Sequence, residues 1–179
     1  MVVSYEVEND KRLERRLKEA KRKVSDLRFA FGEIARDWWK SNKTQFNLKS
    51  SGLYPPLSPE YDERKRKLAG RNLPILVGAD PGGGESGRLR DSVSGTPNSD
   101  SILVIRKLFL VLGTSVPHAP YVQGGTSRMP ERKFMFIGPE APRAAGNPIR
   151  GRLSRWLQIL EADVARQLKS AGLNVKKRP

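Results

Sequence analysis

In residues 11–39, KRLERRLKEAKRKVSDLRFAFGEIARDWW, apolar side chains recur at alternating spacings of four and three positions. This spacing puts them on one face of an α-helix, while charged residues occupy the other faces. The members of the stripe are Leu13, Leu17, Ala20, Val24, Leu27, Phe31, Ile34 and Trp38. The pattern predicts one long helix that runs from about Lys11 to the low forties.

The length of this helix leaves two interpretations open. The helix packs only on its own domain, or its apolar face also packs between subunits, because the stripe is longer than a small sheet covers. On the second interpretation, the interface side chains are Leu27, Phe31, Ile34 and Trp38. Trp39 lies beside the stripe, and we predict that it faces a partner.

The middle of the chain predicts one short helix and a small sheet. Ser58 and Pro59 are typical of a helix start, and a basic helix should then continue until Gly70. Short aliphatic runs predict a sheet within about residues 73–137. The expected strands are Ile102–Ile105, Leu108–Leu112 and, as a third, Ser92–Ser94, with Phe134–Ile137 as a further strand or helix start and residues 113–132 as a loop.

The end of the chain shows helical periodicity again. Residues 149–171 have one apolar face that includes Trp156, and Gly172 is expected to end this helix. We therefore divide the chain into an α+β domain at residues 1–145 and a C-terminal helix with a basic tail at residues 146–179.

The composition excludes several classes of site. The 179 residues include no cysteine and one histidine, which rules out disulfides, thiolate metal sites and multi-histidine clusters. No apolar run approaches the roughly 20 residues that span a bilayer. The first residues also lack the basic start and apolar stretch of a signal peptide. We expect a soluble protein without membrane contact, metal or other cofactor.

The net charge of +15 implies an anionic neighbour. Nucleic acid and an acidic protein partner account for it equally well. Basic side chains that flank the loops at both ends of the expected sheet form either a solvated rim or an electrostatic docking surface. These side chains are Arg88, Arg90, Arg128, Arg132 and Lys133.

Two local patterns resemble chemical motifs, but their context is wrong. Residues 82–87, GGGESG, match the glycine fingerprint of dinucleotide-binding folds, which requires a preceding strand and a long helix directly afterwards. His118 lies beside prolines, and catalysis there would need a nucleophile or carboxylate such as Ser115 or Asp80 close in space. Nothing in the sequence brings these groups together, and we predict that the protein is not an enzyme.

Five short segments, called the motif segments below, follow one another in a specific order. They are YPPLSPEY (54–61), SGRLRDSV (86–93), LGT (112–114), APYVQGGT (119–126) and MPERKF (129–134). Their order and spacing resemble those of the phage virion morphogenesis family, the tail-completion or neck proteins of tailed bacteriophages. The resemblance covers about residues 28–140.

The resemblance implies an α+β fold, with a long N-terminal helix packed on a small, mainly antiparallel sheet, to which this chain adds a C-terminal helix. It also implies a structural protein of the virion neck, assembled in the host cytoplasm as a self-associated ring, expected to be a hexamer. The implied neighbours are the connector or adaptor and the tail-terminator or tail-tube proteins, with contact to packaged DNA.

Site residues follow from the same resemblance. Tyr121 and Phe134 are expected as core or interface anchors, and Arg88, Arg90 and Arg132 as partner contacts. We also place Trp156, on the C-terminal helix, at an interface. The alternative function is a non-specific nucleic-acid-binding protein that uses its strong positive charge.

Overall fold

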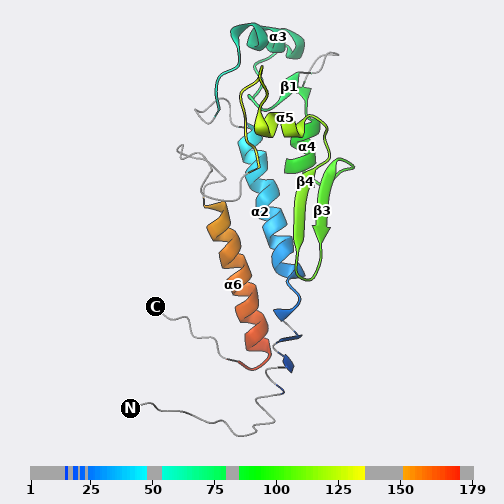
Figure 1. The fold of residues 1–179 in the computed structure, drawn as a ribbon, viewed down its shortest axis with the longest axis vertical. Helices are drawn as coiled ribbons and strands as arrows, with labels where there is room; N and C mark the ends of the chain where they lie inside the picture. Colours follow the sequence, from blue (N-terminus) through cyan, green and yellow to red (C-terminus); the bar gives the residue numbers. More distant parts are fainter. Residues whose placement is uncertain are drawn as a thin grey trace, which may run out of the picture.

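The computed structural model describes residues 15, 18–19, 21–22, 24–47, 54–79, 85–135 and 151–173. It has the α+β fold that the sequence predicts, with a long helix toward the N-terminus, small antiparallel sheets and a C-terminal helix. The described helices are α2 (Arg28–Asn47), α3 (Pro59–Ala69), α4 (Arg88–Ser94), α5 (Ala119–Gly124) and α6 (Arg152–Ser170). The described strands are β1 (Gly78–Ala79), β2 (Glu85–Ser86), β3 (Ser101–Ile105) and β4 (Leu110–Thr114). In Figure 1, α6 and the β3–β4 hairpin lie on different sides of α2, and α3 lies beyond the C-terminal end of α2.

The prediction of one unbroken helix from about Lys11 is wrong, because the chain turns at Ser25 and α2 begins at Arg28. The carboxylate of Asp26 accepts a hydrogen bond from the backbone N–H of Arg28 at 3.2 Å, as a capping side chain does. The backbone N–H of Leu27 donates to the carbonyl of Lys107 at 2.8 Å instead of to a helical neighbour. The stripe residues Leu13, Leu17 and Ala20 lie outside the described residues.

The apolar face of α2 forms one wall of the core. Phe46, which is fully buried, meets Phe134 edge to face with ring centroids 5.7 Å apart. Trp38 is also buried and contacts the ring of Trp39 at 6.1 Å. The buried cluster comprises Trp38, Phe46, Leu73, Val77, Leu89, Val93, Val116, Ala119 and Phe134.

The ends of α3 are as predicted. The Ser58 hydroxyl accepts a hydrogen bond from the backbone N–H of Tyr61 at 3.3 Å, and Pro59 occupies the first turn. Gly70 ends the helix with φ of 65°, a left-handed conformation that glycine adopts without a steric penalty.

The two predicted strands form an antiparallel hairpin, although the second begins at Leu110 and not at Leu108, whereas the predicted third strand is wrong. Strands β3 and β4 pair antiparallel with Ile105 opposite Leu110, and a second antiparallel pair joins β1 to β2. Ser92–Ser94 belongs to α4, where Ser92 and Ser94 donate hydroxyl hydrogen bonds to carbonyls three and four residues earlier. The expected loop at 113–132 contains the short helix α5, which starts after His118 and has proline in its first turn.

Helix α6 packs along α2 through polar contacts. Trp156 donates its indole N–H to the carboxylate of Asp37 at 2.8 Å, and Arg155 forms an ion pair with the same carboxylate at 3.1 Å. The predicted end of this helix is confirmed, because α6 ends at Ser170 and Gly172, just beyond its cap residue Ala171, has φ of 79°. None of the described helices has the length and apolar character needed to cross a membrane. The division of the chain at residue 145 stays a prediction.

Candidate functional site

Two motif segments that are far apart in the sequence meet at Arg132 and Lys133. The Tyr54 hydroxyl donates to the carbonyl of Lys133 at 2.8 Å. Arg132 reaches the same proline-rich segment, with hydrogen bonds of 3.3 Å to the carbonyl of Pro56 and 3.5 Å to that of Pro55. The proline-rich turn is therefore fixed against residues 129–134 before α3 begins.

Gln123 joins the last two motif segments. Its side-chain oxygen accepts hydrogen bonds of 3.0 Å from the backbone N–H groups of both Phe134 and Met135, and its amide donates to the carbonyl of Met135. Between them, the chain reverses at Gly125, whose φ of 71° and ψ of −178° suit glycine almost alone. This reversal lies between α5 and the segment that carries Phe134, which is buried in the core.

The segment at 86–93 completes this framework by forming α4. Leu89 and Val93 lie in the buried core cluster, and the carbonyl of Val93 accepts a hydrogen bond from Asn42 of α2 at 3.0 Å. The hydroxyls of Ser92 and Thr114 are 2.7 Å apart, which joins α4 to the end of β4. All five motif segments thus take part in internal packing or hydrogen bonding.

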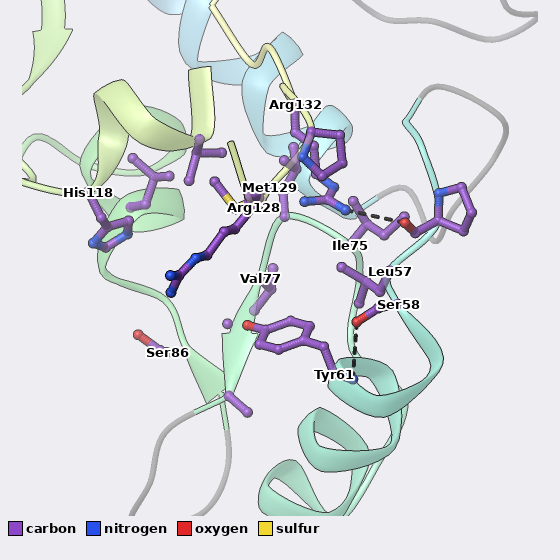
Figure 2. A pocket seen from close by; sticks show the side chains of 17 residues that line it. Leu57, Ser58, Tyr61, Ile75, Val77, Ser86, His118, Arg128, Met129 and Arg132 are labelled. Atoms are coloured by element: carbon purple, nitrogen blue, oxygen red, sulfur yellow. Dashed lines mark hydrogen bonds between the residues drawn. The ribbon is translucent and has the colours of Figure 1, made fainter. Parts of the chain in front are cut away.

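A pocket of about 580 Å³ lies between α3, β1, α4, α5 and the segment that carries Arg128. In Figure 2, Tyr61 and Val77 face the cavity, and Arg128 extends toward the space between His118 and Ser86. The pocket is lined by Pro56, Leu57, Ser58, Tyr61, Ile75, Leu76, Val77, Gly78, Ala79, Ser86, Leu89, His118, Val122, Arg128, Met129, Pro130 and Arg132. Among these described residues there are apolar and basic side chains but no carboxylate.

Two buried cations lie at or beside this pocket. Lys65 is 3% exposed and donates to the carbonyl of Pro74 at 2.7 Å, while Arg132 is 6% exposed. Burial lowers the pKa of Lys65 to about 8, and the nearby Arg132 acts in the same direction while Asp62 opposes it. Burial likewise lowers the pKa of Arg132. Within the described part of the chain, neither cation has a carboxylate within ion-pair distance. Burial therefore disfavours the charged form of both side chains.

Burial shifts the pKa of the neighbouring Tyr54 in the opposite direction, upward. Burial raises the pKa of its hydroxyl to about 12, against the hydrogen bond from Gln45, because the charged phenolate is the form that burial disfavours. Tyr54 is therefore a neutral hydrogen-bond donor at physiological pH.

His118 lies on the rim of the pocket and is exposed. Ser115, a partner considered for it, donates its hydroxyl to the carbonyl of Asp100 at 3.3 Å. Asp80, the other candidate partner, lies outside the described residues. No set of three or more His, Asp or Glu side chains in the described ranges is arranged to hold a metal ion.

The basic residues proposed as a rim differ in their surroundings. Arg88 pairs with Asp100 at 2.7 Å, and this contact raises the pKa of the guanidinium and lowers that of the carboxyl. Arg90 pairs with the adjacent Asp91 at 2.8 Å. Arg128 is exposed at the pocket, whereas Arg132 is buried behind it. The rim residues thus include two arginines in α4 and two at the pocket.

The predicted interface residues fall into three groups by exposure, and partner contact remains a prediction for all of them. Those buried within the chain are Phe31, Ile34, Trp38, Arg132 and Phe134. Those partly buried are Leu27, Trp39, Arg90 and Trp156. Those exposed are Arg88 and Tyr121, and Tyr121 is 59% exposed.

Sequence reasoning missed two apolar surfaces that the structure exposes. The hairpin patch consists of Ile102, Leu108, Phe109 and Val111. The α6 patch consists of Leu153 and Leu157. Helical periodicity put these leucines on an apolar face, but it could not show that α2 leaves that face partly uncovered.

Arg152, a buried residue, was also missed. It is 1% exposed, donates to the side-chain oxygen of Asn42 at 2.9 Å and to Ser41, and lies 5.7 Å from the ring centre of Trp156. Burial lowers its pKa to about 10, although the nearby Asp37 opposes the shift. Arginine is rarely this buried. The signal for it in the sequence was the pair of polar residues, Ser41 and Asn42, on the face of α2 that carries the apolar stripe.

Comparison with family models, curated proteins and solved structures found no match to this chain.

Proposed function

We propose that this protein is a structural subunit of the neck of a tailed-bacteriophage particle. In this role it assembles as a ring, expected to be a hexamer, that joins the connector or adaptor to the tail-terminator or tail-tube proteins. The subunit acts by presenting surfaces to its neighbours and not by catalysis.

The observation that carries the proposal is the way the motif segments interlock. The segments at 54–61 and 129–134 meet through Tyr54, Arg132 and Lys133, and the segment at 86–93 lies in the same core through Leu89 and Val93. Residues that share a pattern for structural reasons are expected to pack together, whereas catalytic residues are expected to converge on a reaction site. This packing supports the resemblance to a structural family.

The distribution of exposed apolar groups supports ring assembly. The β3–β4 hairpin and α6, which carry the two patches, lie on different sides of α2 (Figure 1). A ring needs two distinct surfaces on each subunit, one for each neighbour. Large exposed apolar side chains such as Leu108 and Phe109, which are 66% and 54% exposed, are typical of protein contacts.

The test of ring assembly is the mass of the particle in solution. Native mass spectrometry and light scattering of the full chain, alone and mixed with connectors or tail tubes, should show a closed multimer. A chain that stays monomeric in every mixture, and within assembled particles, would contradict the proposal.

Arg88 and Arg90 test the contact with a neighbour. The double variant Arg88→Glu, Arg90→Glu should remain folded but impair head–tail joining, measured by complementation of infectivity and by electron microscopy. Because Arg88 pairs with Asp100 inside the subunit, the swap Arg88→Glu, Asp100→Arg is the control for internal damage. Normal titres from the double variant would remove both arginines from the mechanism.

DNA binding is the alternative function, and the charge of +15 favours it. However, several described arginines pair with carboxylates of their own chain, such as Arg28 with Asp26 and Arg166 with Asp163. These paired arginines are held by their own subunit, so a continuous phosphate track would have to use other basic residues. Tight binding to DNA at physiological salt by a chain that never self-associates would favour the alternative.

A further inference from the structure

The pocket beside α3 combines an apolar lining with positive charge. Ile75 and Val77 line it together with Met129, and Arg128 and Arg132 supply two guanidinium groups. Its volume of about 580 Å³ fits a few side chains of a peptide. Since none of its described lining residues is acidic, the complementary ligand has apolar side chains with carboxylates beside them.

Arg132 gives independent evidence that the pocket favours an anion. It is 94% buried, and its two hydrogen bonds to proline carbonyls are long, at 3.3 and 3.5 Å. Its Nε has no hydrogen-bond partner among the described residues. A buried cation that lacks both an anion and a full set of acceptors is costly, and a carboxylate in the pocket would offset that cost.

The chain itself contains one segment with the required chemistry. Residues 1–10, MVVSYEVEND, carry three acidic residues and no basic residue, although the whole chain has a charge of +15. Val3, Tyr5 and Val7 alternate with Glu6 and Glu8, so an extended chain would direct apolar and acidic side chains to opposite sides. The C-terminal segment, which ends in KKRP, has the wrong charge for this pocket.

We propose that the pocket binds residues 1–10 of a second copy of this chain. Elements that line the pocket, such as α4 and α5, lie near the C-terminal end of α2, whereas the chain enters α2 at Arg28, at the far end of the helix (Figure 1). We assign the segment to a neighbouring subunit because the ring proposed above sets each subunit beside another copy of the chain. The inference rests on the self-association proposed above, and it names the segment that each subunit gives to the next.

The absence of cysteine allows a direct cross-linking test. Full-length Val3→Cys and Ser86→Cys proteins, with tags of different size, are mixed and treated with a short bis-maleimide. A covalent dimer that contains one copy of each should form. The control partner is Ser154→Cys, an exposed residue of α6 outside the pocket, and it should give little product.

The charges provide a second test that does not depend on a cross-linker. Arg128→Glu should weaken self-association at least about tenfold, which corresponds to about 1.4 kcal/mol. Glu6→Lys with Glu8→Lys should weaken it similarly, and mixing these two variants should restore association through the reversed pair. Lys40→Glu, which changes the same charge at an exposed site on α2, is the matched control.

The outcomes separate this inference from the proposed function. Cross-linking only within a Val3→Cys, Ser86→Cys double variant, and never between mixed single variants, would overturn the assignment to a second copy. An intact multimer with neither cross-link nor charge effect would overturn the pocket assignment and leave the ring proposal standing. A strict monomer in all assays would overturn both.

Discussion

Replacement of Lys65 by methionine should change how stability depends on pH. Lys65 is buried, and its ammonium donates to the carbonyl of Pro74 at 2.7 Å. Burial, helped by Arg132 and opposed by Asp62, lowers its pKa from 10.5 to about 8. Lys65→Met removes the titrating group while keeping an unbranched side chain of similar volume.

The sign of the effect follows from proton binding. Below about pH 8, Lys65 is charged in both the folded and unfolded states, and the full cost of burying the charge applies. Between about pH 8 and 10.5 the folded protein releases this proton while the unfolded chain keeps it, so the free energy of unfolding rises with pH. A pKa difference of about 2.5 units, at about 1.4 kcal/mol per unit, sets an upper bound of about 3.5 kcal/mol.

The assay is urea unfolding of wild type and Lys65→Met at pH 7, 8, 9 and 10. The variant should be about as stable as wild type at pH 7, and wild type should gain about 1–3 kcal/mol relative to it by pH 10. Lys67→Met is the control, because Lys67 is exposed on the same helix. Tyr54, whose folded pKa is about 12, lowers stability above pH 10 in all three proteins. Parallel pH profiles for wild type and Lys65→Met would refute the reasoning.

Three further predictions test the fold and the charge. Ile34→Ala should cost about 2–5 kcal/mol in thermal melts because Ile34 is 3% exposed, whereas exposed Lys21→Ala should be near neutral; equal effects would mean the helix face is misassigned. Gly125→Ala should destabilise by about 1–3 kcal/mol, since its φ is 71° and a Cβ would lie 2.7 Å from the Glu131 nitrogen, while Gly124→Ala, in open space, should not. DNA affinity in fluorescence anisotropy should be weak, sequence-independent and largely lost near physiological salt; persistence there would contradict it.

The sequence predicted the fold class, both ends of α3 and the end of α6, because these depend on local chemistry. Ser58, Gly70 and Gly172 each act within a few residues of themselves, through a capping hydroxyl or a left-handed backbone. The break before α2 has a different origin. The apolar stripe continues without a gap through Leu27. However, the backbone N–H of Leu27 donates to the carbonyl of Lys107 in the hairpin turn, a contact that periodicity cannot reveal.

The assignment of Ser92–Ser94 as a strand failed because three residues cannot distinguish the two periods. Leu89 and Val93 lie four apart, which is helical spacing, and both are buried. Ser92 and Ser94 satisfy their hydroxyls on carbonyls of the preceding turn, so these residues are compatible with a short helix in a packed setting. Tertiary packing on α2 decides the outcome.

The site was predictable only in pieces. Arg132 and Phe134 were singled out as motif residues, and their positions in one framework with Tyr54 depend on hydrogen bonds to carbonyls. Carbonyls are present at every residue, so sequence gives no signal of which one will be used. The burial of Lys65 and Arg152 was unpredictable for the same reason, since Lys65 donates to a backbone carbonyl and Arg152 donates to the side chains of Ser41 and Asn42.

The buried charges connect the pH prediction with the pocket. Lys65 is close enough to Arg132 that the second cation lowers its pKa further. If a carboxylate of residues 1–10 binds beside Arg132, it partly neutralises the positive charge that Arg132 exerts on Lys65. The pKa of Lys65 must then rise toward its ordinary value. The gain in stability between pH 8 and 10 should therefore be largest for dilute subunits and smaller for the assembled protein. The measurement compares pH profiles at low and high protein concentration, across a range where light scattering shows assembly. Identical profiles would show that self-association does not change the charge in the pocket.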